Sequence, residues 1–152
     1  MNLPDYKSAI IAQMISTTQE KIDLSKAQIT SIQQSKSSAT KSTAGDKHET
    51  GRAMMERELA FAQSALTKAQ QQLADIEKLA ESGASDIVVF GSLVETSKGF
   101  FMFGVSLGKI SIAGESCFAI SAASPIGSAM LGKSTGDTFE FNGISNQILS
   151  IT

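Results

Sequence analysis

The sequence predicts an α+β protein in which a long antiparallel hairpin of two helices, paired as a coiled coil, precedes a small antiparallel β-sheet domain with one short helix. Glycine and phenylalanine are concentrated after Gly83, where nine of the 12 Gly and seven of the eight Phe occur. Proline is absent between Pro4 and Pro125. Uninterrupted helix is therefore expected in the first half, and strands with turns in the second. We place the two domains at 1–82 and 83–152, because Ser82 and Gly83 are typical of a helix end.

The second helix carries a sustained heptad seam. Its residues follow alternating steps of four and three: Met55, Leu59, Ala62, Leu66, Ala69, Leu73, Ile76 and Ala80. The first helix keeps the same steps with smaller occupants: Ile11, Ile15, Thr18, Ile22, Ser25, Ile29 and Ile32. Such seams need a partner helix. Antiparallel pairing within one chain buries both seams and predicts a monomer, while the heptads leave a dimerising coiled-coil adaptor open as an alternative.

The segment Ser37–Thr50 is small and polar, as a turn requires, and the tip of the hairpin is expected at about 41–51. A first helix of roughly 35 residues, at about 1.5 Å each, gives an arm on the order of 50 Å. That length exceeds what a small C-terminal domain can cover. The arm is therefore expected either to dimerise or to carry its tip into another molecule.

Two carboxylates stand at this tip. Asp46 and Glu49 are three residues apart and lie on one face if the second helix begins here. They also fit an N-cap and its capping-box partner, the interpretation that local physics alone favours. A metal site built from Asp46, His48 and Glu49 alone would be incomplete and exposed, so the chain is expected to hold no metal by itself.

The second half predicts short strands between Gly- and Ser-containing turns. The expected strands are Ile87–Phe90, Ser92–Thr96, Phe100–Val105, Lys109–Ile112, Ser116–Ser121, Thr138–Phe141 and Gln147–Ile151. A short helix is expected over Ser124–Lys133, where Ser caps, Pro takes the first helical position and Gly ends it. The base of the hairpin is expected to complete this small core, and Cys117 to pack in or near it.

Composition excludes several function classes. A formal net charge of −2 does not suit a nucleic-acid coat, and no apolar run is long enough to cross a bilayer. One His, one Cys and the lack of a nucleophile elbow or phosphate-cradling loop argue against a self-contained enzyme. With no secretory signal and no possible intrachain disulfide, a cytoplasmic protein is expected.

A family resemblance rests first on the C-terminal half. Ser124–Lys133 has the sequence Ser-Pro-Ile-Gly-Ser-Ala-Met-Leu-Gly-Lys and is followed by Gly136-Asp137. It resembles the C-terminal pattern of the bacterial Gre transcript cleavage factors, Ser-Pro-(Leu/Ile)-Gly-x-Ala-(Leu)-(Leu/Ile)-Gly-Lys with a later Gly-Asp before a strand.

The hairpin adds to the resemblance. Gly45, Asp46 and Glu49 keep the register of the family's tip motif Gly-Asp-Leu-x-Glu-Asn, and Arg57-Glu58 meets its Arg-Glu pair. Departures from the family's tip are Lys47, Thr50 and Ala53, which replace an apolar residue, an Asn and a Tyr. The resemblance covers nearly the whole chain and suggests a diverged member.

The resemblance implies an FKBP-like sheet domain and an accessory factor of RNA polymerase. The hairpin would enter the polymerase's secondary channel, where Asp46 and Glu49 would help hold the second catalytic Mg²⁺ and position a water that cleaves backtracked RNA. The chain would have no cofactor of its own, would share this Mg²⁺ with the polymerase, and would meet the nascent RNA 3′ end through the complex.

Further binding residues are expected near the tip and in the C-terminal motif: Lys47, Arg52, Arg57, Glu58, Ser124 and Pro125. The positive charges of Lys47 and Arg52 are expected either to weaken metal capture or to contact RNA or the polymerase. A channel factor that inhibits or competes without stimulating cleavage is therefore the alternative function. A prolyl isomerase or chaperone is disfavoured, since the only Tyr precedes the sheet domain and there is no Trp.

Overall fold

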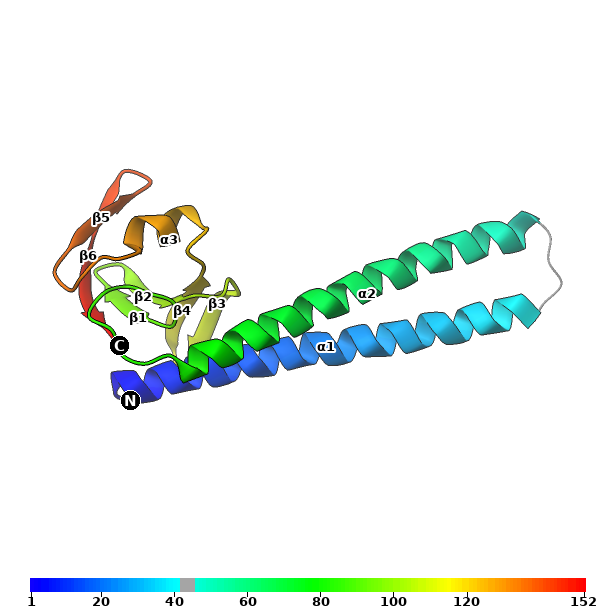
Figure 1. Ribbon diagram of the computed structural model, residues 1–152, viewed down its shortest axis with the longest axis horizontal. Coiled ribbons are helices and arrows are strands. Elements are labelled where there is room, and N and C mark those ends of the chain that lie inside the picture. The colour runs from blue at the N-terminus through cyan, green and yellow to red at the C-terminus, as the bar shows by residue number, and fades with distance from the viewer. Residues whose placement is uncertain (42–45) are drawn as a thin grey trace. The chain divides into compact units, whose positions relative to one another are not determined.

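The computed structural model describes the backbone of residues 1–41 and 46–152, and in that range every side chain except those of residues 39–41 and 46–48. Two long helices come first, α1 (Leu3–Lys41) and α2 (Asp46–Glu81). They run antiparallel and pack together (Figure 1). Both helices extend further into the expected turn than Ser37–Thr50 suggested, because adding residues to an existing helix costs little even for Ser and Thr.

The chain divides into two compact units. One consists of Met1–Ser16 together with Ala74–Thr152, and so combines the first turns of α1 and the last turns of α2 with all the strands. The other is Thr17–Leu73, which holds the remainder of the helical pair. Each unit has its own interior.

The first unit contains a six-stranded sheet in the order β3-β4-β2-β1-β6-β5. Its elements are β1 (Leu93–Thr96), β2 (Gly99–Phe103), β3 (Gly108–Ile112), β4 (Glu115–Ile120), α3 (Pro125–Met130), β5 (Thr138–Phe141) and β6 (Ile144–Ile151). The α+β class is confirmed. The sheet is mixed, however, and the prediction of an antiparallel sheet was wrong: β4 inserts between β2 and β3 and runs parallel to β2, with Phe100 beside Cys117 and Phe103 beside Ile120.

The sheet separates two apolar clusters, since successive residues of a strand point to opposite faces. Leu93 and Met102 join one cluster, while Val94 and Phe101 join the other. Helical residues complete the first cluster: Tyr6, Ile10, Ile11, Met14, Ile76 and Leu79. The expectation that the base of the hairpin completes the core is confirmed, and Cys117 is buried in the same cluster. Met130 of α3 packs in the second cluster.

One predicted strand is missing: Ile87–Phe90 forms no strand, only an isolated bridge from Ile87 to Ser134. Val88 is buried, and its N–H donates to the Lys133 carbonyl at 2.8 Å while its own carbonyl accepts from Gly132 at 2.9 Å. The segment is apolar because Val88 enters the core, and its backbone pairs with the turn after α3 instead of extending a ladder.

Most of the predicted seam lies in the second unit, while Ile11, Ile15 and Ile76 belong to the first. Every predicted α1 seam residue is buried or half-buried, as are the α2 seam residues from Met55 to Ile76. The prediction of Ala80 was wrong, because Ala80 is exposed and Leu79, which belongs to the first unit, is fully buried. A straight helix has 3.6 residues per turn, so a strict heptad drifts off the buried face after several turns.

Candidate functional site

Among the described side chains, the tip of the arm presents one exposed carboxylate, that of Glu49. Since α2 begins at Asp46, Asp46 and Glu49 occupy the first helical turn at a spacing of three, next to the point where α1 ends. Glu49 is exposed. The side chains of Asp46, Lys47 and His48 lie outside the described residues, and so do the predictions of capping and of metal contact at Asp46.

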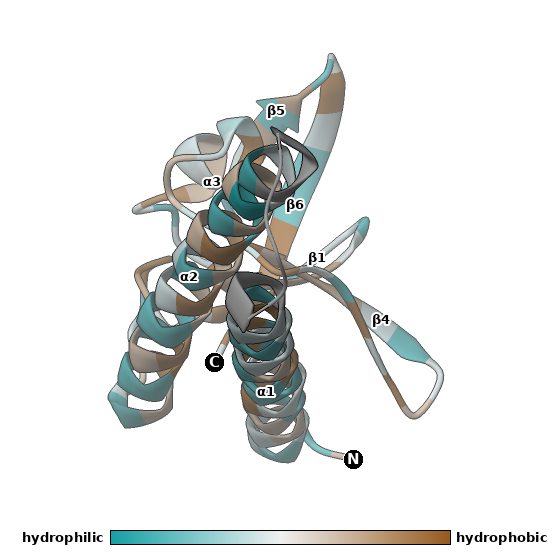
Figure 2. Ribbon diagram, turned by 90° about the vertical axis from the view of Figure 1, so that its right-hand side faces the viewer, coloured by the Kyte–Doolittle hydropathy of each residue, from teal (hydrophilic) through white to brown (hydrophobic). Residues whose placement is uncertain are grey.

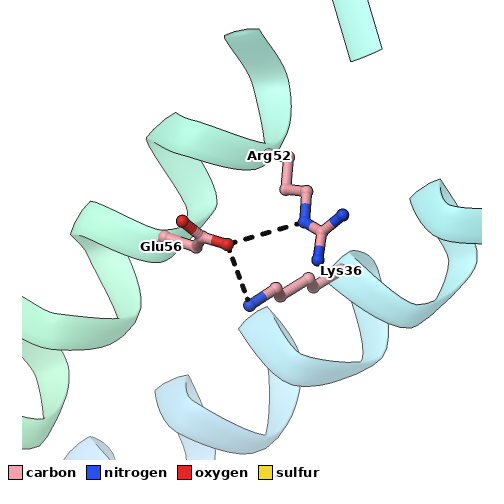
Figure 3. A network of polar contacts seen from close by, with 3 residues as sticks. All are labelled: Lys36, Arg52 and Glu56. Carbon is pink, nitrogen blue, oxygen red and sulfur yellow. Dashed lines mark ion pairs between the residues drawn. The ribbon is translucent and has the colours of Figure 1, made fainter. Parts of the chain in front are cut away.

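Behind the tip, one carboxylate ties the two helices together (Figure 3). Glu56 Oε1 of α2 lies 3.3 Å from Lys36 Nζ of α1 and 3.5 Å from Arg52 Nε. All three side chains are partly exposed, so each pair contributes at most about 1 kcal/mol. The contact from Lys36 joins α1 to α2 near the tip. Arg52, a predicted binding residue, is thus oriented toward Glu56 while about half of it stays exposed.

Arg57 and Glu58, also predicted binding residues, line a groove between the helices. This groove has a volume of about 590 Å³, and its lining comes from both arms: Gln28, Ser31, Ile32, Arg57, Glu58, Phe61 and Ala62. Arg57 and Glu58 are exposed at this groove. The walls are mainly apolar, with one cation and one anion among them.

The C-terminal motif residues have structural roles. Ser124 caps α3: its hydroxyl accepts from the Gly127 N–H at 3.1 Å and donates to the Ser121 carbonyl at 2.7 Å. Pro125 stands exposed at the start of the helix, where its missing N–H costs nothing. The capped helix with Pro at its start confirms the prediction for this segment. The hydroxyl of Ser124 therefore has two partners within the chain, while the ring of Pro125 is exposed.

The later Gly-Asp pair is structural too. Asp137 Oδ2 accepts from the Ser134 N–H at 2.8 Å, which closes the turn before β5. Gly136 has a φ of +90°, a conformation that other residues rarely adopt. The two parts of the motif therefore build one helix and one turn.

No three His, Cys, Asp or Glu side chains within the described part of the chain are placed to hold a metal ion. Among the helices of residues 1–41 and 46–152, none is long and apolar enough to cross a membrane. The described chemistry at the tip is an exposed carboxylate at the end of a helical pair. Such a group suits a metal whose other ligands another molecule supplies.

Sequence reasoning missed two features of the arm. The Arg52–Glu56 pair has the i,i+4 spacing that marks helical ion pairs and was detectable from that spacing. The groove at Phe61 had no such signal, because it depends on which residues of α1 and α2 lie at the same level.

Comparisons with protein-family models, with curated proteins and with solved structures find no match to this chain. The Gre resemblance therefore stays a prediction that rests on the residues quoted for it.

Proposed function

We propose that the protein is an accessory factor of RNA polymerase, a diverged Gre-like protein whose helical arm enters the secondary channel. Asp46 and Glu49 then add oxygen ligands to the second Mg²⁺ of the polymerase and position the water that cleaves backtracked RNA. The chain supplies carboxylates and takes the metal and the RNA 3′ end from the complex, so it is not an enzyme in its own right.

The observation that carries this proposal is the position of Glu49. It is exposed in the first turn of α2, three residues after Asp46, at the end of the helical pair where the chain reverses. The part of α1 from Thr17 to Lys41 spans about 37 Å at ~1.5 Å per residue, which is enough to carry a group deep into a narrow channel.

The sheet domain has a separate part in the proposal. We infer that it is FKBP-like and docks at the channel rim, with Pro125 and its neighbours on α3 as candidate contacts. Arg57 and Glu58 are candidate contacts along the arm, and Lys47 and Arg52 beside the tip. We expect such a factor to work in the cytoplasm as a monomer.

A second candidate is a channel factor that inhibits or competes without stimulating cleavage. The charges behind the tip favour it: Lys36, Arg52 and Glu56 together carry one net positive charge within two turns of Glu49. Positive charge near a carboxylate competes with a metal ion for it. The replacements Lys47, Thr50 and Ala53 point the same way.

The deciding experiment uses stalled, backtracked RNA polymerase complexes with wild-type protein and the double variant Asp46→Asn/Glu49→Gln. We expect wild type to shorten the RNA, and the variant to bind polymerase but cleave at least about tenfold more slowly, as for lost metal-site contacts. Glu20→Gln, which removes an exposed carboxylate of α1 far from the tip in sequence, is the matched control and should cleave like wild type.

Three other results each decide something. Equal cleavage by wild type and the double variant excludes the tip from the mechanism. Inhibited RNA synthesis without cleaved product selects the second candidate. Failure of the wild-type chain to bind polymerase overturns both.

A further inference from the structure

The sheet unit contains a pocket beside the start of α1, here called the N-terminal pocket. Its volume is about 330 Å³, near the lower end of the range for small-molecule sites. Figure 2 shows apolar and polar bands along α1, whose first turns pack in the first apolar cluster. Apolar walls come from Met1, Leu3, Phe100 and Ile112, and polar groups from Tyr6 and Glu115. All six residues belong to the sheet unit, so the pocket does not depend on the arm.

One polar atom of the N-terminal pocket has no partner. Tyr6 is only 6% exposed, and its hydroxyl forms no hydrogen bond within the described part of the chain. Buried polar groups are nearly always hydrogen-bonded, because leaving one unpaired costs free energy. The ring itself is well packed: it meets Phe100 edge-on, with the ring centroids 5.1 Å apart and the planes at 70°. The side chain is therefore held in place while its hydroxyl is left without a partner.

Glu115 gives the same pocket a negative charge. Of the side chains that line it, only that of Glu115 is charged, and it is exposed. No Lys, Arg or amino terminus among the described residues lies within ion-pair distance of it. The pKa of Tyr6 is raised first by burial, then by the charge of Cys117 and then by that of Glu115. The carboxylate thus lies close enough to the phenol to act on it.

Other charged groups of this region are engaged elsewhere or unpaired with the pocket. Glu95 accepts from the Ser150 hydroxyl at 3.0 Å, and Lys7 donates to the Thr152 carbonyl at 3.1 Å. Neither Glu95 nor Lys7 lines the pocket. Met1 does line it, but its amino group forms no ion pair with the carboxylate of the pocket. The carboxylate is therefore left for a ligand.

We propose that the N-terminal pocket binds a small amine with an apolar body, in its protonated ammonium form. The ammonium donates one hydrogen bond to the Glu115 carboxylate and one to the Tyr6 hydroxyl oxygen. An ammonium has three donors and no acceptor, which suits two oxygen atoms, and hydrogen bonds between ionised groups are the stronger kind. The aromatic wall attracts a cation as well. An anionic ligand would be repelled by Glu115, and a purely apolar one would leave both polar groups unmatched.

Binding needs a small movement at the rim, because the Tyr6 hydroxyl is closed off in the free protein. Met1 is the residue that can provide it. It precedes α1, which begins at Leu3, and is 80% exposed. Its side chain can move aside without unwinding the helix.

This proposal does not rest on the proposed role at RNA polymerase. The pocket lies in the sheet unit and the acidic tip at the far end of the other unit. Failure of either proposal leaves the other standing.

Calorimetric titration of the full chain at about pH 7, where the carboxylate is ionised and an alkylamine protonated, tests the proposal. The probe is cyclohexylmethylamine, and we expect one site with a Kd on the order of 1 mM or tighter. Cyclohexylmethanol keeps the body without the charge, and cyclohexanecarboxylate reverses the charge. Both should bind at least about tenfold more weakly. Because the chain has a single Tyr and no Trp, its fluorescence reports on Tyr6 alone and should saturate with the same Kd.

Two variants test the assigned contacts. Glu115→Gln should raise the Kd for the amine about tenfold or more, as for a lost hydrogen bond between charged groups. Tyr6→Phe should also raise the Kd, while the Tm of the free protein stays equal or rises because an unpaired hydroxyl is removed. Glu140→Gln is the matched control. It removes an exposed carboxylate of β5, at the opposite edge of the sheet from β3, and should bind like wild type.

Four results would each overturn the proposal. One is no binding of the amine at about 10 mM, and another is equal binding of the amine and the alcohol. A third is an unchanged Kd for Glu115→Gln, which would place the amine elsewhere. The last is an unchanged Kd for Tyr6→Phe together with a lower Tm, which would give the hydroxyl a purely structural role.

Discussion

The two units bury very different side chains. The interior of the sheet unit is built from large residues that are fully enclosed, among them Ile10, Leu79, Met102, Phe103 and Ile148. In the arm unit the buried residues are few and mostly small or polar: Thr18, Ile22, Ser25, Ala62 and Ala69. The arm's larger residues Leu59 and Leu66 are only half-buried, and Phe61 is exposed.

The two units therefore differ in how much they contribute to the stability of the fold and in how much apolar surface they expose. Burial of apolar area is the main source of folding free energy, so the sheet unit supplies most of the stability. The arm buries a thinner seam and leaves some apolar residues, such as Leu24 and Phe61, exposed to solvent. Elements that act on partners are commonly drawn from the less stable parts of a fold. The proposed function places the acidic tip and most of the candidate contacts on the arm.

The largest expected effect is on the free energy of unfolding, which should fall by different amounts when the same substitution is made in each unit. Leu79→Ala removes a fully buried side chain of the sheet unit, and we expect it to lower the free energy of unfolding by about 3–4 kcal/mol. Leu66→Ala, the same change at a half-buried seam position of the arm, should cost about 1 kcal/mol. Urea denaturation followed by circular dichroism measures both. Equal losses would show that the arm is as well packed as the sheet unit.

Glycine-to-alanine substitutions should also affect the stability of the two units differently, by smaller amounts. A Cβ at Gly127 of α3 would lie 1.9 Å from the Ser121 carbonyl oxygen, so Gly127→Ala must displace backbone and should cost about 2–3 kcal/mol. A Cβ at Gly51 of α2 would meet nothing within 4 Å among the described residues, apart from its chain neighbours and the backbone of its own helix. Gly51→Ala should therefore stabilise the arm by up to about 1 kcal/mol, because Ala favours a helix interior. Thermal unfolding of the two variants compares them, and a shift of the same sign in both would contradict this account.

Most elements of both units were predictable from the sequence, because they depend on residues that are close together in the chain. The cap at Ser124 and the seam of the arm follow from short spacings, and the structure has them. The parallel pairing of β2 with β4 was missed because strand order depends on contacts distant in sequence. Ile87–Phe90 was mistaken for a strand since an apolar run does not reveal whether its backbone meets a ladder or a turn.

The features of the candidate site can likewise be sorted into those that were predictable from local sequence and those that were not. The spacing of Asp46 and Glu49 on α2 was predictable, because it needs only the start of one helix. The link from Lys36 to Glu56 was not, since it requires the register of two helices. The groove lined by Ile32 and Phe61 also depends on that register.

The pH dependence of stability tests the closed interior of the sheet unit. Burial raises the pKa of the Cys117 thiol from 9.0 to about 12, against a smaller opposing effect of a hydrogen bond with the Met102 backbone. Between these values the folded chain keeps a proton that the unfolded chain releases. Stability is therefore complete below about pH 9 and falls as the pH rises toward 12, by at most ~1.4 kcal/mol per pH unit.

Cys117→Ala should make that fall shallower, as measured by urea denaturation at about pH 8 and about pH 10. Part of the slope should remain, since the pKa of Tyr6 in the same cluster is raised as well, first by burial and then by the negative charges of Cys117 and Glu115. Wild type and variant with identical slopes would mean that the thiol titrates freely in the folded protein.

The smallest expected effect on the free energy of unfolding comes from a buried hydroxyl in the arm. Thr18 is fully buried in the seam, and its hydroxyl has no hydrogen-bond partner among the described residues. A buried hydroxyl without a partner costs on the order of 1 kcal/mol. Thr18→Val keeps the shape and the β-branch while removing the hydroxyl, and should raise the free energy of unfolding by about that amount in urea denaturation.

Thr30→Val is the matched control for this defect. The Thr30 hydroxyl is exposed and donates to the Lys26 carbonyl at 3.1 Å, so its loss should change stability by less than about 0.5 kcal/mol. If Thr18→Val destabilised the protein instead, the hydroxyl would be holding the register of the two helices, as buried polar residues do in some coiled coils. The arm would then be a specified structure despite its thin seam, and the contrast between the two units would be one of packing density alone.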